Sequence, residues 1–518
     1  MRLPRTSGIL LHPTSLPGPH GSGDFGPAAY HFVDWLVSAG QKLWQILPLG
    51  GIGPGNSPYM SSSAFAGNVL MIDLAELAGR GWLAEADLAP DTFPVPAPAF
   101  GTEPARDAAT ASAAARIDFG RVVPWRMARL GRAAAAFAAQ AAPADQAEFN
   151  AFCQAQSAWL DDYALFMALS EANGGREWGD WSAELVQRQP AAMAAARSAL
   201  ASRIGFWQFT QWCFFRQWLR LKAYANERGI LIVGDAPIFI AYQSAEVWAR
   251  QELFELDPTG KPTVIAGVPP DYFSATGQRW GNPLYRWSAH ADEGYSWWIE
   301  RIRRTFAMVD IVRIDHFRGF ADYWEIPASQ STAMFGRWLP GPGAALFEAI
   351  EAALGALPII AEDLGLLTPE VELLRRRFDF PGMRILHFAF GGDAGNAYLP
   401  HNYEPNTVVY TGTHDNNTTP GWWAEASAAE RAHVIEYLGL HGGAVDADLH
   451  WSLIRAAMAS VADTAITQLQ DVLGLGRAQR MNLPGVGAGY WEWRFTWEEV
   501  RPEHASRLAQ WARLYGRA

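Results

Sequence analysis

Segment 311–320 (IVRIDHFRGF) places an arginine and an aspartate two residues apart in an apolar stretch. Residues two apart on a strand share a face, so Arg313 and Asp315 are predicted to point into one pocket. A buried charge is costly unless it is paired or used. The pair is therefore either a structural ion pair or a carboxylate that an arginine stabilises at a reaction centre, and the segment alone favours neither.

Two more carboxylates end strand-like segments later in the chain: Glu362 in segment 358–364 and Asp415 after segment 408–414. Glycoside cleavage needs two carboxyl groups beside one bond. One attacks or stabilises the developing sugar cation, and the other protonates the leaving oxygen. The spacing from Asp315 to Glu362 corresponds to one strand–helix unit with its loops, so neighbouring strands would bring both side chains to one sugar.

Eight strand-like segments recur along the chain, with helical segments between most of them. They span residues 8–12, 42–49, 230–240, 311–317, 358–364, 383–390, 408–414 and 479–484. Eight strands close a parallel barrel whose reactive groups lie at the carboxyl ends of the strands. We therefore predict an α/β fold, a (β/α)8 TIM barrel with large, mainly helical insertions. An open sheet with helices on both faces is the alternative.

Further polar residues lie where the predicted strands end or in the loops that follow. Asp235 lies in the third strand, His414 ends the seventh, and Asn482 lies in the eighth. After the second strand, the loop GGIGPGNSPYMSSSAFAG presents Ser57 and Tyr59. Its glycines resemble a phosphate-binding loop, but prolines interrupt it and no helix follows directly, so we predict a rigid, irregular loop.

Composition divides the chain into three parts. Residues 1–78 are predicted to form the first part of the barrel with the irregular loop, and residues 206–518 the remainder. Residues 79–205 between them are rich in alanine but carry aromatic side chains that a core can bury. We predict a helical insertion subdomain there.

The 518 residues are 49% hydrophobic and 18% charged, which is typical of a chain with a large core. A formal net charge of -12 argues against nucleic acid and anionic membranes as partners. The 24 tryptophans are typical of a core and also of a groove that stacks sugar rings.

Targeting and metal signals are missing from the sequence. Two distant cysteines, no signal-peptide pattern and no apolar stretch of about 18 residues predict a cytoplasmic protein. No His or Cys spacing indicates a metal site, and the chain carries neither a dinucleotide fingerprint nor a GxSxG motif.

Ten segments, in chain order, carry a resemblance to a known family. They are LLHPTSLPG, LPLGGIGPGNSPYMSSSAFAGN, GDAPIFIA, GVPPDYFSATGQRWGNPLY, VRIDHFRGF, IIAEDLG, PGMRILHFAF, YLPHNY, YTGTHDNNTTPGW and RMNLPG. The chain resembles the 4-alpha-glucanotransferases of the amylomaltase (disproportionating enzyme) type, which are relatives of the alpha-amylases. The resemblance is specific because the segments span nearly the whole chain.

The resemblance implies a retaining double-displacement reaction on alpha-1,4-glucans and maltooligosaccharides, with glucose as an acceptor and no metal or organic cofactor. Asp315 is then the nucleophile, Glu362 the general acid/base, and Asp415 a third carboxylate that grips substrate hydroxyls and favours the distorted sugar. A loop within 250–290 is expected to cover the acceptor side of the cleft. The residues expected to bind substrate are Ser57, Tyr59, Asp235, Asp271, Gln278, Trp280, Arg313, His414 and Asn482.

The chain departs from the family pattern at several positions near these motifs. They are Met60, Tyr242, Gln243, His387, Asn417 and Tyr490. Because none of them is one of the three carboxylates, they bear on acceptor preference and product size, while the reaction type stays as implied.

Three other functions fit parts of the same pattern. An alpha-amylase-like hydrolase would use the same carboxylates and differ only in letting water reach the glucosyl-enzyme. A non-catalytic glucan-binding protein has no need for a protonated acid beside a nucleophile. A sugar-phosphate enzyme would need a phosphate loop after the seventh and eighth strands, where basic residues are few. Transfer of alpha-1,4-glucan segments is therefore the predicted function, and hydrolysis is the alternative.

Overall fold

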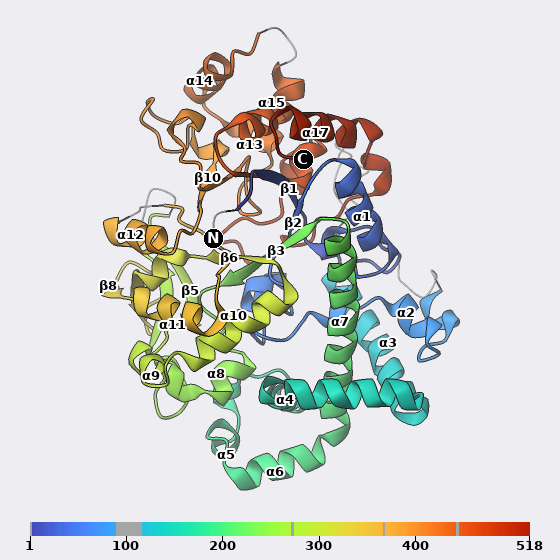
Figure 1. The fold of residues 1–518 in the computed structure, drawn as a ribbon. Coiled ribbons are helices and arrows are strands. Elements are labelled where there is room, and N and C mark those ends of the chain that lie inside the picture. Colours follow the sequence, from blue (N-terminus) through green and yellow to red (C-terminus); the bar gives the residue numbers. More distant parts are fainter. Residues whose placement is uncertain (1–2, 90–115, 271–273, 366–367, 442–444) are drawn as a thin grey trace, which may run out of the picture.

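Eight parallel strands form one sheet at the centre of the molecule (Figure 1). The computed structural model describes residues 3–89, 116–270, 274–365, 368–441 and 445–518. In spatial order the strands are β10 (Gly382–Ile385), β11 (Thr407–Tyr410), β12 (Thr464–Gln468), β1 (Thr6–Leu10), β2 (Leu43–Gln45), β3 (Leu231–Pro237), β6 (Ile311–Asp315) and β9 (Ile359–Ala361).

The two end strands of this sheet, β9 and β10, lie beside each other and close the barrel. The backbone N–H of Ala361 donates to the carbonyl oxygen of Pro381 at 3.0 Å. The buried Asp363 carboxylate accepts a hydrogen bond from the N–H of Met383 at 2.6 Å and lies 3.5 Å from the Arg384 guanidinium. The predicted (β/α)8 barrel is therefore confirmed.

Seven of the eight predicted strands overlap strands of the barrel, and the eighth prediction is wrong. The eighth strand is β12, which pairs with β1 and β11. All five of its residues are buried although Thr464, Thr467 and Gln468 are polar, so its hydropathy pattern is weak. Segment 479–484 instead follows a 3₁₀ turn, Arg477–Gln479, and runs as a loop.

Helices surround the strands. Those not wholly within the predicted insertion are α1 (Pro27–Ser38), α2 (Leu74–Gly79), α7 (Ala201–Glu227), α8 (Ala245–Ala249), α9 (Trp287–Asp292), α10 (Ser296–Met308), α11 (Ala344–Leu354), α12 (Pro369–Arg377), α13 (Thr419–Glu425), α14 (Ala428–Leu438), α15 (Val445–Ala459), α16 (Leu469–Val472) and α17 (Pro502–Leu514). Residues 386–406, between β10 and β11, are all described and hold only the 3₁₀ turns Leu386–Phe388 and Pro400–Asn402.

The first helix illustrates how the barrel is packed. Pro27 opens α1 at a position where its missing N–H costs no hydrogen bond. Phe32, Val33 and Leu36 recur at helical spacing and are buried. The indole ring of Trp44, on β2, contacts Phe32 edge-on with the ring centroids 5.1 Å apart. Aromatic packing thus joins α1 to the strand beneath it.

The described part of the alanine-rich segment is helical, with α3 (Phe119–Gln140), α4 (Pro143–Ala172), α5 (Ala183–Val186) and α6 (Pro190–Ala199). Figure 1 shows α4, α5 and α6 together at one end of the molecule, opposite α13, α14 and α15. Phe137 of α3 packs against Trp212 of α7 with the ring centroids 5.1 Å apart. These helices therefore share buried aromatic residues with α7, and the bounds 79–205 of an insertion subdomain stay a prediction.

A second, four-stranded antiparallel sheet is built from the segments that follow β3 and β6. Its strands, in spatial order, are β5 (Gln278–Pro283), β4 (Val264–Val268), β7 (Asp322–Pro327) and β8 (Arg337–Pro340). Ala333 donates from its backbone N–H to the carbonyl oxygen of Thr276 at 3.1 Å, which joins the β7–β8 turn to the β4–β5 loop. The sheet thus fixes the 274–280 segment, in which two of the expected substrate residues lie.

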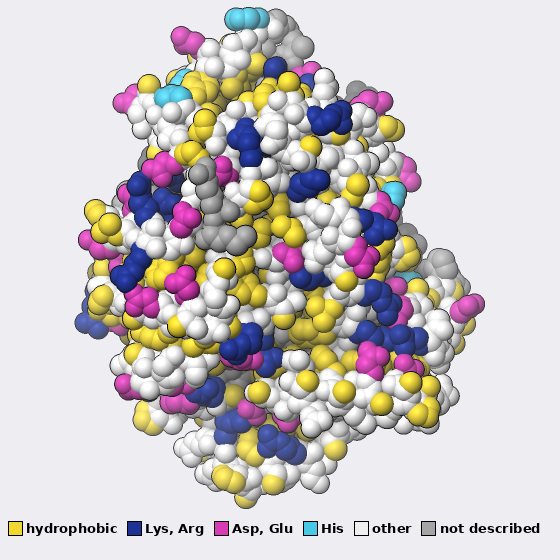
Figure 2. Space-filling model, viewed as in Figure 1, with side chains coloured by type: hydrophobic (Ala, Val, Ile, Leu, Met, Phe, Trp, Pro, Cys, Tyr) yellow, Lys and Arg dark blue, Asp and Glu magenta, His cyan; other side chains and the backbone are white. Residues whose placement is uncertain are grey.

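The surface carries charges of both signs. Figure 2 shows acidic and basic side chains interspersed over this face of the molecule. Among the residues that the structure describes, no helix is long and apolar enough to cross a membrane.

Candidate active site

Arg313 joins two carboxylates at the carboxyl end of the barrel. The parallel register of β3 and β6 sets Asp235 directly opposite Arg313. The guanidinium Nη1 donates to both Asp235 oxygens at 2.8 Å, and Nη2 lies 2.8 Å from Asp315 Oδ1. Arg313 and Asp235 are buried, whereas the Asp315 side chain is 31% exposed. The predicted ion pair therefore exists, and it leaves the Asp315 side chain partly accessible.

Glu362, at the end of β9, has different surroundings. Its Oε2 accepts a hydrogen bond from the N–H of His316 at 2.7 Å, and its Oε1 accepts one from the N–H of Leu364 at 2.9 Å. Burial, reinforced by the negative charge of Asp315, raises the pKa of Glu362 to about 8, although Arg313 opposes this rise. The raised pKa favours the protonated form of Glu362 at neutral pH, beside an aspartate that contacts a guanidinium.

His316 connects these two carboxyl groups through the backbone. Its φ is 51°, in the left-handed region that non-glycine residues adopt at a cost of about 1–3 kcal/mol. This bend, directly after Asp315, aims the backbone N–H of His316 at Glu362. The bend at His316 thus fixes the position of the Glu362 carboxyl group relative to that of Asp315.

Asp415 lies on the loop after β11 and has a third set of partners. Its Oδ1 accepts a hydrogen bond from the Asn482 amide at 2.6 Å and lies 3.4 Å from His414 Nε2. The Tyr59 hydroxyl donates to Asp235 Oδ2 at 2.8 Å, so it accepts from His414 Nε2–H at 2.9 Å. The Asp415 side chain is 40% exposed and therefore available to a substrate.

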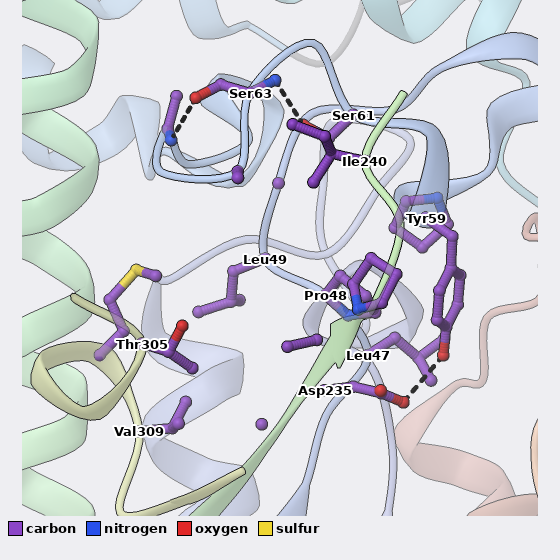
Figure 3. A pocket seen from close by; sticks show the side chains of 18 of the residues that line it. Leu47, Pro48, Leu49, Tyr59, Ser61, Ser63, Asp235, Ile240, Thr305 and Val309 are labelled. Carbon is purple, nitrogen blue, oxygen red and sulfur yellow. Dashed lines mark hydrogen bonds between the residues drawn. The ribbon is translucent and has the colours of Figure 1, made fainter. Parts of the chain in front are cut away.

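Figure 3 shows the hydrogen bond between Tyr59 and Asp235 at the edge of a cavity of about 70 Å³. Leu49 and Ile240 belong to its apolar lining, and Thr305 and Val309 lie on its far side. Tyr59 belongs to the lining of this cavity. Its hydroxyl is held in place by the hydrogen bonds to Asp235 and His414.

The remaining expected substrate residues are Trp280, Gln278, Ser57 and Asp271. The indole of Trp280 lies edge-on to the His316 ring, with the ring centroids 4.8 Å apart, and donates to the Gln278 side chain at 3.2 Å. Ser57 accepts a hydrogen bond from the N–H of Tyr59 at 3.3 Å and so caps the turn that carries the phenol. Asp271 lies outside the described residues.

Three of the departures from the family pattern have clear contacts. Gln243 accepts a hydrogen bond from the N–H of Trp178 at 2.9 Å, and the carbonyl oxygen of Tyr242 accepts one from the Trp178 indole at 2.8 Å. They join the loop after β3 to the helical segment. His387 is buried and stacks on Trp422 with the ring centroids 4.9 Å apart, and burial lowers its pKa to about 3.

The candidate metal ligands among the described residues are dispersed. In the part of the chain that the structure describes, no three His, Cys, Asp or Glu side chains form a group that could hold a metal ion. That the reaction needs neither a metal nor an organic cofactor stays a prediction.

Comparison with known proteins assigns the chain to a family. A family model described as 4-alpha-glucanotransferase matches residues 11–499, which include all three carboxylates. The chain belongs to the 4-alpha-glucanotransferase family. It is 49% identical to the 4-alpha-glucanotransferase of Thermus thermophilus, over 98% of both chains. It is also 49% identical to that of Synechocystis, over 99% of this chain and 98% of the relative.

Solved structures agree with this assignment. The amylomaltase of Streptococcus agalactiae, solved with acarbose, is 38% identical and superposes with a TM-score of 0.92 over 99% of this chain and 100% of its own. The amylomaltase of Corynebacterium glutamicum is 19% identical and has a TM-score of 0.78 over 98% of this chain and 75% of its own, which shows a shared fold. The predicted family and enzyme class are therefore confirmed.

The sequence analysis missed the residues that hold the Asp415 loop. Gln468, the last residue of β12, and Asp471, on α16, form hydrogen bonds with this loop. The Arg480 guanidinium donates to the carbonyl oxygens of Asp415 and Asn482. The sequence does contain one indication: the polar pair Gln470–Asp471 lies between the apolar residues of segment 469–474 (LQDVLG). An acid that is buried there needs hydrogen-bond partners.

Proposed function

We propose that this 4-alpha-glucanotransferase moves alpha-1,4-glucan segments from a donor to the 4-hydroxyl of an acceptor glucan or glucose, through a covalent intermediate on Asp315. The observation that carries the proposal is the contrast between the two carboxyl groups. Asp315 touches the Arg313 cation, whereas Glu362 has a pKa raised to about 8. A charged nucleophile beside a protonated acid is what a retaining glycoside reaction needs.

In the first step, an Asp315 oxygen attacks the anomeric carbon of the donor sugar. Glu362 gives its proton to the glycosidic oxygen as that bond breaks, and the reducing-end fragment leaves with a new 4-hydroxyl. The products are a glycosyl ester on Asp315 and an ionised Glu362. Arg313 stabilises the Asp315 carboxylate before the attack and does not itself transfer a proton.

In the second step, the 4-hydroxyl of the acceptor gives its proton to Glu362 and attacks the anomeric carbon. The ester bond to Asp315 breaks, and both acids return to their starting states. Two displacements on opposite faces retain the configuration. The product is an alpha-1,4-glucan whose length differs from that of the donor.

The other expected residues have supporting roles in this proposal. Asp415 and Asn482 bind hydroxyls of the donor sugar, with the rigid Tyr59–His414 pair as the wall of the same subsite. Trp280 and Gln278 bind the acceptor, because the indole lies beside His316 on the β4–β5 side of the cleft. Ser57 acts by positioning Tyr59, and Asp271 is assigned to the acceptor side from sequence alone.

We also propose that the enzyme works in the cytoplasm. Cys153 and Cys213 are both free thiols, as is usual in a reducing compartment.

Incubation with maltotriose tests the proposed function. Transfer yields glucose and a ladder of longer maltooligosaccharides while the number of reducing ends stays constant, because each cleavage is matched by a new bond. A steady rise in reducing ends would show that water accepts the glucosyl group and would replace transfer by hydrolysis. Labelled glucose added as an acceptor should enter the ladder at the reducing end, and its exclusion would limit the acceptors to longer glucans.

A further inference from the structure

Asp471 is a buried carboxylate that lies behind the loop of Asp415. It sits on α16, directly after β12, and is fully shielded from solvent. Its Oδ2 accepts a hydrogen bond from the Thr411 hydroxyl at 2.6 Å, and its Oδ1 accepts one from the backbone N–H of Thr419 at 2.6 Å. Both hydrogen bonds are short, as expected for donors to a charged acceptor.

These two donors are the two ends of the loop that carries the third carboxylate. Thr411 follows β11, and Thr419 is the first residue of α13. Between them lie His414 and Asp415. One side chain therefore fixes both the start and the end of segment 411–419.

Gln468 extends the same contact set. Its side-chain amide lies 3.3 Å from Asp471 Oδ2 and donates to the carbonyl oxygen of Asn417 at 3.2 Å. Within the loop, the Asn416 side chain accepts hydrogen bonds from the Thr413 N–H and hydroxyl, both at 2.9 Å. The residues on each side of Asp415 are thus held in a fixed turn.

The burial of Asp471 is costly and needs a reason. Burial raises the pKa of Asp471 to about 6, and its hydrogen bonds to Thr411 and Thr419 oppose this rise. The interactions that oppose the rise are hydrogen bonds from Thr411, Thr419 and Gln468, and no Lys or Arg of the described residues is among them. An apolar side chain would pack a core more cheaply than a buried acid without a cation, so the acid is explained by the geometry it enforces.

We propose that Asp471 is a positioning residue for the reaction: it holds Asp415 and His414 at the donor sugar by clamping both ends of the 411–419 loop. The inference rests on the role proposed above for Asp415. Asp471 does not reach the substrate, because it is buried beneath the loop. Its effect therefore passes through the position of Asp415.

The Thr411 side of the clamp offers a matched pair of variants. Thr411→Ser keeps the hydroxyl that donates to Asp471, whereas Thr411→Val keeps the shape and removes the donor. We expect Thr411→Val to lower kcat by about 10–100-fold with KM changed less than about threefold, because a displacement of about 1 Å at a catalytic group has this order of effect. Thr411→Ser should stay within about threefold of the parent in kcat, because the hydrogen bond can form.

Asp471→Asn tests the clamp from the other side, with Asp24→Asn as its control. The Asp471→Asn variant would keep the side-chain volume but lose one acceptor, so kcat per folded enzyme should fall by about 10–100-fold. Asp24 is also buried and binds Arg126 at 2.7 Å, between α3 and the N-terminal loop. Asp24→Asn should lower the melting temperature while leaving kcat within about threefold, since its partners are remote from Asp415.

Asp415→Asn, measured in parallel, separates the two proposals. If Asp415→Asn keeps the parent kcat, the role of Asp415 is wrong and the positioning role falls with it. If Asp415→Asn is inactive but Thr411→Val retains the parent kcat, the positioning role alone is overturned. Equal losses of kcat in Thr411→Ser and Thr411→Val would likewise overturn the positioning role. This comparison can be made even if Asp471→Asn does not fold.

Discussion

The carboxyl ends of β6 and β9 present two acids to the same cleft in opposite surroundings. Asp315, on β6, lies 2.8 Å from a guanidinium nitrogen, and that guanidinium is anchored by the buried Asp235. Glu362, directly after β9, has backbone N–H groups as its hydrogen-bond donors and faces the charge of Asp315.

In the proposed mechanism, the role of each acid therefore follows from its neighbours and not from the kind of acid. A cation in contact favours the ionised form, which attacks carbon. Burial and a nearby negative charge favour the protonated form, which donates to oxygen. Arg313 contacts Asp315 and also lowers the pKa of Glu362, so a change at Arg313 is expected to affect both acids.

Removal of the β6 acid should have the largest effect. Asp315→Ala leaves no oxygen to attack the anomeric carbon, so kcat for maltotriose transfer should fall by on the order of 10³-fold or more. Binding of maltohexaose, followed by titration calorimetry, should remain measurable because the other contacts persist.

A matched control for this variant is Asp34→Ala. Asp34 also pairs with an arginine, Arg228, at 3.1 Å, but between α1 and α7. Its loss should leave kcat unchanged. A turnover of Asp315→Ala close to that of the parent would remove Asp315 from the mechanism.

Removal of the β9 acid should have the next largest effect. Glu362→Gln keeps the size of the side chain but can neither give nor take the proton, so kcat should fall by about 10²–10⁴-fold. A donor with a fluoride leaving group needs no acid for the first step. In the first turnover, the variant should therefore release fluoride from maltotriosyl fluoride with a smaller loss of rate than it cleaves maltotriose. An equal loss for both donors in that first turnover would argue against the acid role.

Weakening the cation should have an intermediate effect. Arg313→Lys keeps a positive charge, but an ammonium cannot span Asp235 and Asp315 as the guanidinium fork does. We expect kcat to fall by at least about tenfold, because Asp315 loses its fixed position. A lysine variant with the parent kcat would show that charge alone is sufficient.

The pH dependence should show the smallest effect and reports directly on Glu362. Its pKa is raised to about 8, so the acid is protonated below that pH and ionised above it. Since the first step needs the protonated form, kcat/KM should level off below about pH 8 and fall about tenfold per pH unit above it. The residual activity of Glu362→Gln should lack this alkaline limb. A limb with the same midpoint in that variant would assign it to another group.

The barrel and its chemistry could be predicted from the sequence where charge and hydropathy agree. Apolar runs that end in an acid located β6 and β9, and with them Asp315 and Glu362. The prediction failed at β12, where buried Thr464 and Gln468 weaken the apolar pattern and α16 follows with no turn between. The strand expected at 479–484 is a loop, although Asn482 still reaches Asp415.

The contacts that could not be predicted are those set by tertiary packing. Nothing local to Asp471 indicates that it will meet Thr411 and Thr419, because these residues lie more than 50 positions away along the chain. The left-handed bend at His316 is likewise invisible in the sequence, since a positive φ is uncommon for any residue other than glycine. The contacts of Asp471 and the bend at His316 both depend on the register in which distant strands pair.

The proposed mechanism requires that Asp315 forms a covalent bond to the sugar while Glu362 moves the proton. Glu362→Gln treated with maltotriosyl fluoride should form the ester without an acid and break it slowly without a base. Mass spectrometry of the digested variant should find a maltotriosyl adduct on the peptide that contains Asp315, and none when Asp315→Ala is combined with it. An adduct on the peptide that contains residue 362 or on the one that contains Asp415 would contradict this mechanism. Turnover with no adduct at any time point would contradict it as well.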